Sequence, residues 1–236
     1  MRVSALSDVG LSRKNNEDNF SICAPHLYVV ADGMGGHQAG EVASKIAVTT
    51  VKEYVLKYGP NQLDGDLLRD AIREANRQVF EAAAARPDCT GMGTTVSAVI
   101  VRDSQIHWAH VGDSRIYLFR EGKAELITDD HSVVWQLLKQ GGITSEEAEV
   151  HPKRNMLTRA VGIDAEIEVD VGSNPFFVGD QLILCTDGLT NLVSGEELAQ
   201  ITTQFSDAEE TVKYLVNQAK ERGGFDNITV ILIDNR

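Results

Sequence analysis

The sequence contains little cysteine. Its three cysteines, Cys23, Cys89 and Cys185, lie far apart, are odd in number and form no CxxC pair. This usage is typical of reduced, partly buried thiols, and it predicts a cytosolic protein without a disulfide framework.

Long hydrophobic runs are also missing. No apolar stretch approaches the roughly 20 residues that a membrane-spanning helix needs. The N-terminal segment "MRVSALSDVG" becomes polar within seven residues, which does not fit a signal peptide. We therefore expect a cytoplasmic protein with no membrane partner.

Positive charge is scarce as well. The chain has 22 basic and 35 acidic residues, a formal net charge of −13. Such a balance disfavours nucleic acids and anionic membranes as partners, because both repel an acidic surface. An anionic substrate would have to be bound through local positive charge or through bound cations.

The 236 residues show no internal repeat, no low-complexity tract and no linker rich in proline or serine. One domain over residues 1–236 is therefore expected. Apolar residues at three- and four-residue spacing predict helices over residues 39–58, 66–85, 196–203 and 208–222. Residues 131–163 are expected to be helical and loop-like. Strand-like segments are predicted at 2–7, 20–24, 27–31, 94–102, 105–112, 115–120, 123–128, 167–171, 180–185 and 227–234.

The four strand-like segments between residues 94 and 128 are separated by only two to five residues. Gaps this short suit antiparallel hairpins and leave no room for helical crossovers. Antiparallel strands interrupted by two pairs of helices predict an α+β fold, with two sheets packed face to face and helices outside. A doubly wound βαβ fold is the alternative, and it fits the pattern poorly.

Acidic residues recur where predicted strands end. The segment "VVADGMGGHQAGE" at residues 29–41 carries an aspartate at the end of an apolar run, followed by several glycines. Carboxylates packed together repel one another unless cations neutralise them, and Mg²⁺ or Mn²⁺ prefers oxygen ligands. The alternative is that Asp-Gly pairs are only turns and that acidic loops keep the protein soluble. Repetition of the pattern favours the metal site; its members are Asp32, Asp113, Asp187 and Asp226, with Glu17 and Asp18 before another strand.

At this point the motifs resemble those of a known family. "SDVGLSRKNNED", "DGMGGH", "GMGTT", "HVGDSR", "TDDHS", "TDGL" and "GGFDNITV", in this order, are similar to motifs of the bacterial type 2C, metal-dependent (PPM) serine/threonine protein phosphatases. The resemblance extends from about residue 7 to residue 230. It implies an α–β–β–α sandwich of two antiparallel sheets flanked by helix pairs, with the metal site at one sheet edge.

The resemblance also implies an activity and a set of ligands. Phosphoserine and phosphothreonine in proteins would be hydrolysed by a water that bridges two Mn²⁺ or Mg²⁺ ions. Asp32 would bridge both ions, and a third ion is expected at Asp113. The implied metal ligands are Asp32, Gly33, Asp187, Asp226, Asp113, Asp18 and Glu17. The expected partners are phosphorylated proteins and a Hanks-type kinase, and the chain is expected to act as a monomer.

Arg13 is the candidate for binding the phosphoryl group, because a guanidinium matches phosphate oxygens in a bidentate way. The general acid is less defined. Animal and plant members of the family carry histidine directly after the Asp-Gly pair, where this chain has Met34. His37, three residues on, is the candidate; a purely local role at a helix start is the alternative. His110 and His131 have weaker claims.

Residues 132–162 correspond to the mobile flap of bacterial relatives. Lys153, Arg154 and Arg159 form a basic cluster there, which is either a solvated surface or a guide for phosphopeptides. Two other functions are alternatives. A pseudophosphatase is disfavoured because Asp32, Asp187 and Asp226 are all present, and a metal-dependent nuclease because no basic stripe offers a path for a phosphate backbone.

Overall fold

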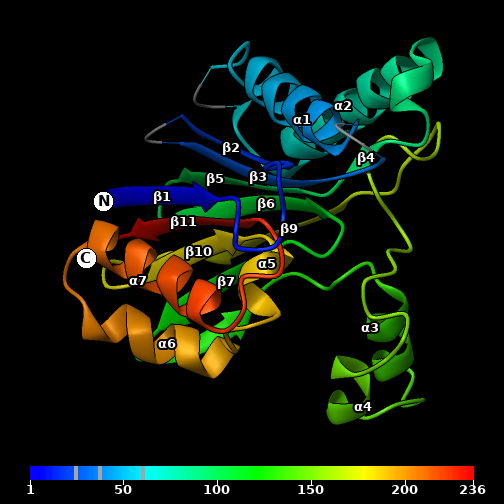
Figure 1. Cartoon of the computed structure of the whole chain (residues 1–236). Coiled ribbons are helices and arrows are strands. Elements are labelled where there is room, and N and C mark those ends of the chain that lie inside the picture. Colours follow the sequence, from blue (N-terminus) through cyan, green and yellow to red (C-terminus); the bar gives the residue numbers. More distant parts are fainter. Residues whose placement is uncertain (24–25, 37–38, 60–61) are drawn as a thin grey trace.

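The computed structural model describes residues 1–23, 26–36, 39–59 and 62–236. Two antiparallel sheets lie face to face (Figure 1). In spatial order the first contains β1 (Arg2–Asp8), β11 (Ile228–Asp234), β10 (Gln181–Cys185), β7 (Arg115–Arg120) and β8 (Lys123–Leu126). The second contains β2 (Asp18–Cys23), β3 (Leu27–Met34), β5 (Val96–Arg102), β6 (Gln105–Val111) and β9 (Asp170–Pro175), while the short β4 (Gly93–Thr94) pairs with the end of β3.

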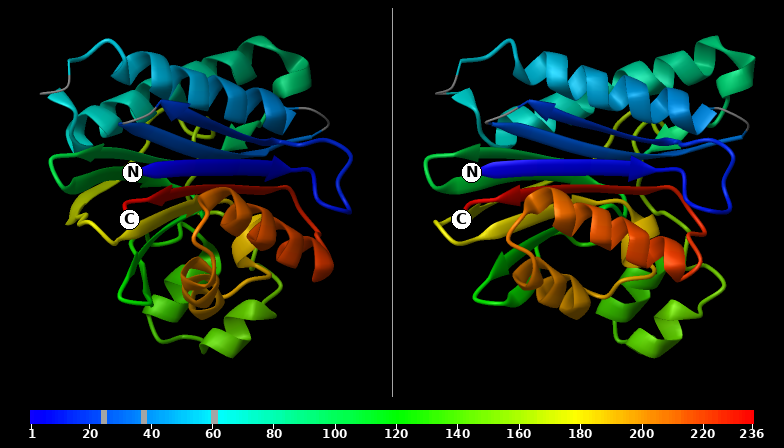
Figure 2. Two further views of the ribbon diagram at one scale, coloured as in Figure 1. Left: turned by 90° about the vertical axis from the view of Figure 1, so that its left-hand side faces the viewer. Right: turned by 60° about the vertical axis from the view of Figure 1, so that its left-hand side comes forward.

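Helices cover the outer face of each sheet, and the two views of Figure 2 show the resulting four layers. The second sheet is covered by α1 (Ala39–Val55) and α2 (Gly65–Ala85), the first by α6 (Gly195–Gln204) and α7 (Ala208–Glu221). The short helices are η2 (Pro87–Cys89), α3 (Val133–Lys139), α4 (Ser145–Glu149) and α5 (Asp187–Thr190). Helices α3 and α4 lie apart from the sandwich, inside the expected flap (Figure 1). No helix in the described part of the chain is both long and apolar enough to cross a membrane.

Three hydrophobic clusters hold the layers together, one in each space between them. Strands β3 and β10 are buried along most of their length, so their apolar side chains serve both faces of a sheet. Val29 packs toward α1 and α2, whereas Val30 faces the opposite sheet. This alternation follows from the two-residue period of a strand. The predicted α–β–β–α sandwich is therefore confirmed.

Several predicted boundaries were wrong. Helix α1 ends at Val55 rather than at residue 58, because Gly59 followed by Pro60 disfavours continued helix. Tyr58, expected on the buried stripe, is 39% exposed. The strand expected at 167–171 is instead β9, which begins at Asp170, where pairing with β6 starts opposite His110.

One predicted hairpin is also absent. Strands β6 and β7, separated only by residues 112–114, do not pair with each other. β6 belongs to the second sheet and β7 to the first, so the short link crosses from one sheet to the other. Gly112 makes the crossing possible with a φ of +111°, a backbone conformation that favours glycine. The crossing places the next residue, Asp113, between the sheets.

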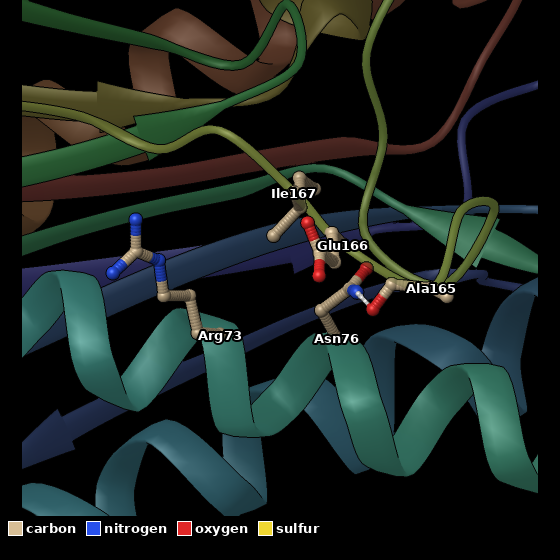
Figure 3. Close-up of a pocket in the computed structure, with 5 residues that line it drawn as sticks. All are labelled: Arg73, Asn76, Ala165, Glu166 and Ile167. Atoms are coloured by element: carbon tan, nitrogen blue, oxygen red, sulfur yellow. Dashed lines mark hydrogen bonds between the residues drawn. The ribbon is translucent and has the colours of Figure 1, made fainter.

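Helix α2 holds the C-terminal end of the flap region. Buried Asn76 accepts a hydrogen bond from the Gly162 amide at 2.7 Å and donates to the carbonyl oxygens of Asp164 and Ala165 at 2.9 and 3.3 Å. Figure 3 shows the hydrogen bond between Asn76 and Ala165 beside a cavity of about 270 Å³, which is lined by Arg73, Asn76, Ala165, Glu166 and Ile167. Asn76 thereby supplies hydrogen-bond partners to backbone groups of residues 162–165, a segment that belongs to neither sheet.

Candidate active site

The predicted site residues come from loops that meet at one end of the sandwich. The loop after β1, the end of β3, the crossing at residues 112–114, helix α5 and the loop before β11 contribute them. Figures 1 and 2 show the β1–β2 loop beside the loop before β11. This end lies opposite the chain termini, on the side from which the flap projects (Figure 1).

Two of the aspartates lie on neighbouring strands. Asp18 and Asp32 are directly opposite each other in the β2–β3 pair. The backbone of Asp32 is held on both sides, because its amide donates to Thr95 Oγ1 at 2.8 Å and its carbonyl accepts from Thr94 Oγ1 at 2.8 Å. Asp18 is buried and accepts a hydrogen bond from Thr186 Oγ1 at 2.8 Å. Asp18 is thereby tied to the start of α5 in the other sheet layer.

Asp187 and Asp113 approach from the first sheet and from the crossing. Asp187 is the first residue of α5 and accepts from Asn191 Nδ2 at 3.0 Å. Asp113 is oriented through its neighbour Ser114, whose hydroxyl lies 2.6 Å from Thr95 Oγ1. The hydroxyl of Thr95 therefore connects the backbone of Asp32 with the segment that carries Asp113.

The electrostatics show that these carboxyls are close enough to repel one another. Burial, together with neighbouring negative charges, raises the pKa of Asp18 to about 7 and the pKa of Asp32 well above its usual range. The pKa values of Asp113 and Asp187 are raised for the same reasons. Asp187 contributes to the raised pKa of Asp18, Asp32 and Asp113, so all four share one field.

The donor set fits a hard divalent cation. Asp18 Oδ1 and Asp187 Oδ1 are buried and have no hydrogen-bond partner in the described structure. Such an orphaned anionic oxygen is costly unless a cation or a proton satisfies it. Across residues 1–23, 26–36, 39–59 and 62–236, no group of three or more His, Cys, Asp or Glu side chains is arranged so that it could hold a metal ion by itself. Mg²⁺ usually keeps several waters and needs only one or two carboxylates, so an open arrangement suits it.

Gly33 and Glu17 meet at the start of α1. The Gly33 amide donates to the Glu17 carbonyl at 3.1 Å. A Cβ on Gly40 would lie 2.6 Å from Glu17 Oε2 and 2.7 Å from the Gly33 carbonyl oxygen, so only glycine permits the two oxygens to approach. Burial, with the charges of Asp226 and Glu41, raises the pKa of Glu17. The structure thus brings these predicted ligands together beside a glycine whose role the sequence had not indicated.

Arg13 lies at the outer side of this group. Its Nη2 is 2.7 Å from Asp226 Oδ2, and the side chains are 53% and 32% exposed. The hydrogen bond to Asp226, with the charges of Asp226, Glu17 and Asp32, raises the pKa of Arg13.

Asn227 organises the loop before β11. Its Oδ1 accepts a hydrogen bond from the Glu17 amide at 2.8 Å, and its Nδ2 donates to the carbonyl oxygens of Val9 and Asn15 at 3.0 Å. Two loops more than 200 residues apart are thereby joined at one asparagine.

The histidines are distributed differently from the aspartates. His37 lies outside the described residues. His110 is fully buried between Ser97 and the Gly112 carbonyl, and burial lowers its pKa to about 3, so it remains neutral and sealed from substrate. His131 is also buried; burial and the charge of Arg159 lower its pKa. Neither of these two buried histidines suits the general-acid role.

Three positioning hydroxyls were missed by the sequence interpretation: those of Thr95, Ser114 and Thr186. Each lies next to an aspartate or in the "GMGTT" motif, yet threonine and serine at such positions also serve as ordinary caps and turn residues. Thr186 occupies the N-cap position of α5. Its hydroxyl donates to the Asp18 carboxylate and makes no hydrogen bond to the helix backbone. Only the spatial neighbour of each hydroxyl shows what it does.

A family model described as protein phosphatase 2C matches residues 12–221. The chain belongs to the protein phosphatase 2C family. The predicted family and the predicted class of enzyme, a phosphatase and thus a hydrolase, are confirmed.

Relatives of this phosphatase align over nearly their whole length. A putative protein phosphatase 2C-type from Streptococcus pyogenes is 38% identical over 100% of this chain and 98% of its own. The serine/threonine phosphatase stp of Listeria monocytogenes is 39% identical over 99% of this chain and 96% of its own. Among solved structures, the Mycobacterium tuberculosis serine/threonine phosphatase PstP/Ppp superposes with a TM-score of 0.92 at 38% identity, covering 99% and 97% of the two chains.

A second solved structure bears on the metal. The catalytic domain of the serine threonine protein phosphatase PstP, solved in complex with two manganese ions, matches with a TM-score of 0.90 at 36% identity, over 99% of this phosphatase and 97% of that chain. A member of the family thus holds two manganese ions.

Proposed function

We propose that this phosphatase hydrolyses phosphoserine and phosphothreonine in proteins, using two divalent cations held at the end of the sandwich. The observation that carries the proposal is the set of buried and half-buried carboxylates with raised pKa values and two orphaned oxygens, together with the exposed Arg13. The proposed ligands are Asp32, Gly33, Asp187, Asp226, Asp18 and Glu17, with Asp113 at a third, weaker position. Mn²⁺ and Mg²⁺ both suit these oxygen donors.

When bound, the ions supply Lewis acidity at phosphorus and lower the pKa of a water shared between them. The residues of the chain do the rest. Hydrogen bonds from Thr94 and to Thr95 hold the backbone of Asp32, which limits the movement of its carboxylate. Arg13 binds the phosphoryl oxygens in a charge-assisted contact. The leaving alkoxide needs a proton, and we propose His37, which lies outside the described residues, and Asp113 as the candidate groups to supply it.

The proposal requires no covalent intermediate. Cys89 and Cys185 are buried, and burial raises the pKa of Cys185 to about 12. Cys23 is the last residue of β2, and Asp18 is the first residue of the same strand, so the thiol lies at the end of the strand away from the site. None of the three thiols is therefore suited to attack phosphorus.

Direct attack by water can be tested in a single turnover. We expect that acid quenching of the manganese-loaded enzyme with a ³²P-labelled phosphothreonine peptide leaves no label on the protein at any time point. A chiral thiophosphate ester should react with inversion at phosphorus, as one displacement requires. Labelled protein together with retention of configuration would contradict the mechanism.

Replacing Arg13 tests the phosphate contact. For Arg13→Ala we expect KM for phosphopeptides to rise about ten- to a hundredfold, because hydrogen bonds to charged groups contribute roughly 1.5–3 kcal/mol. Arg13→Lys should recover only part of the loss, since lysine lacks the planar fork. Steady-state kinetics give KM, and calorimetric Mn²⁺ titration reports whether loss of the Asp226 ion pair changes metal affinity. Unchanged kinetics in Arg13→Ala would remove this residue from the site.

We further propose that the enzyme acts as a monomer and reverses the work of a Hanks-type kinase. The motive is membership of the protein phosphatase 2C family. Comparison of the phosphorylation sites of cells with and without the enzyme would identify its substrates.

A further inference from the structure

Two large apolar side chains stand exposed beside the arginine of the proposed phosphate site. Leu11 is 64% exposed and Phe225 is 65% exposed. Leu11 precedes Arg13 by two residues, and Phe225 directly precedes Asp226, the ion-pair partner of Arg13. Scattered exposed apolar residues are ordinary, but two that flank one functional ion pair require an explanation.

Both side chains rest on the same pair of glycines. A Cβ on Gly223 would collide with the ring of Phe225, and a Cβ on Gly224 would lie 3.0 Å from Leu11 Cγ. The two glycines have φ values of +127° and +50°. The glycine pair of the "GGFDNITV" motif therefore provides a flat backbone platform on which the ring and the leucine lie.

The platform is held in place by contacts on both sides. The Leu11 amide donates to the Gly224 carbonyl at 2.8 Å, and Lys220 near the end of α7 forms an ion pair with Asp8 at 2.8 Å. Asn227 adds hydrogen bonds to the β1–β2 loop. A surface already held in one arrangement loses little entropy when a ligand covers it.

We propose that Leu11 and Phe225 form an apolar shelf that binds a bulky apolar side chain next to the phosphoserine or phosphothreonine of the substrate. The proposal rests on the proposed function, because Arg13 must bind the phosphoryl group. An extended peptide advances about 3.3 Å per residue, so the residues flanking a phosphoresidue at Arg13 lie over the side chains adjacent to that arginine. The shelf makes this enzyme prefer phosphopeptides with leucine-like neighbours over those with polar neighbours.

The test uses phosphothreonine peptides that differ only in carrying leucine or serine at one of the two positions before or after the phosphoresidue. For wild type we expect about a tenfold higher kcat/KM with leucine at one or more of these positions, the scale on which apolar pockets discriminate. In Phe225→Ser and in Leu11→Ser the ratio should fall toward 1, whereas kcat/KM for an aryl phosphate, which has no neighbours, should stay within about twofold. Phe225→Leu should keep most of the preference.

Phe177→Ser is the matched control, because Phe177 is 53% exposed but precedes β10 at the opposite end of the sandwich. Its leucine-to-serine ratio should equal that of wild type. Equal rates for leucine and serine peptides at all four positions in wild type would overturn the shelf and leave the phosphatase proposal intact. Absence of metal-dependent hydrolysis of every substrate would instead overturn the proposed function. If Phe225→Ser also loses aryl phosphate hydrolysis, Leu11→Ser decides, and an unchanged ratio in that variant overturns the shelf.

Discussion

Asp32→Ala should lower kcat at least about 10³-fold for both aryl phosphates and phosphopeptides. The ions supply several kcal/mol of charge stabilisation in the transition state, and each 1.36 kcal/mol corresponds to a factor of ten in rate. Asp32 is the proposed bridge between them, and four neighbouring aspartates raise its pKa. Asp32→Asn keeps the shape of the side chain and removes its charge, so it should be nearly as inactive. Steady-state kinetics and calorimetric Mn²⁺ titration measure both effects.

Asp113→Ala is the matched comparison, because Asp113 shares the same field but reaches the site from the crossing between the sheets. We expect this variant to keep the two-ion core and the stabilisation that metal gives to the folded state. Its kcat should fall about ten- to a hundredfold for phosphopeptides and much less for aryl phosphates, whose good leaving group needs little help from an acid. If Asp113→Ala loses core metal binding as Asp32→Ala does, the separate third position is wrong. If neither variant loses metal, the site itself is wrong.

Metal removal should abolish activity. It should also make the free energy of unfolding decrease as the pH rises. Chelation with EDTA should reduce hydrolysis to background, and added Mn²⁺ or Mg²⁺ should restore it. Burial raises the pKa of Asp18 from 3.8 to about 7, so this carboxyl keeps its proton in the metal-free folded state longer than in the unfolded chain. Its contribution to stability is therefore complete below pH 4 and is lost as the pH rises through 7.

The loss extends over the pH range between the two pKa values, because the unfolded chain releases the Asp18 proton at a lower pH than the metal-free folded protein does. Urea unfolding of the EDTA-treated protein between pH 4 and pH 8 should show this decline. Saturating Mn²⁺ should suppress it, because a bound cation favours the ionised carboxylates. Asp18→Asn removes one of several titrating carboxyls with raised pKa values and should make the metal-free decline less steep. Full activity after chelation, or a metal-free profile that Mn²⁺ does not alter, would contradict the carboxylate-metal centre.

The sequence by itself determined the family and the layered α+β architecture, and it indicated the acidic residues that we propose as metal ligands. These properties follow from local patterns. The two-residue period of β3 and the helical period of α2 record which faces are buried, and an aspartate beside glycine at the end of a strand marks a polar group at the edge of a sheet. The seven ordered motifs add information that no single pair of residues contains.

Only the tertiary structure decided which strands pair and which side chains meet. The gap between β6 and β7 predicts a hairpin, yet the chain changes sheets there and so places Asp113 between the layers. The hydroxyl of Thr186 binds Asp18 across 168 residues of sequence, and Leu11 lies on Gly224 across more than 200. Local periodicity reports burial but not the identity of the covering neighbour. That neighbour is set by the packing of sheets and loops against one another, which brings together residues that no spacing in the sequence connects.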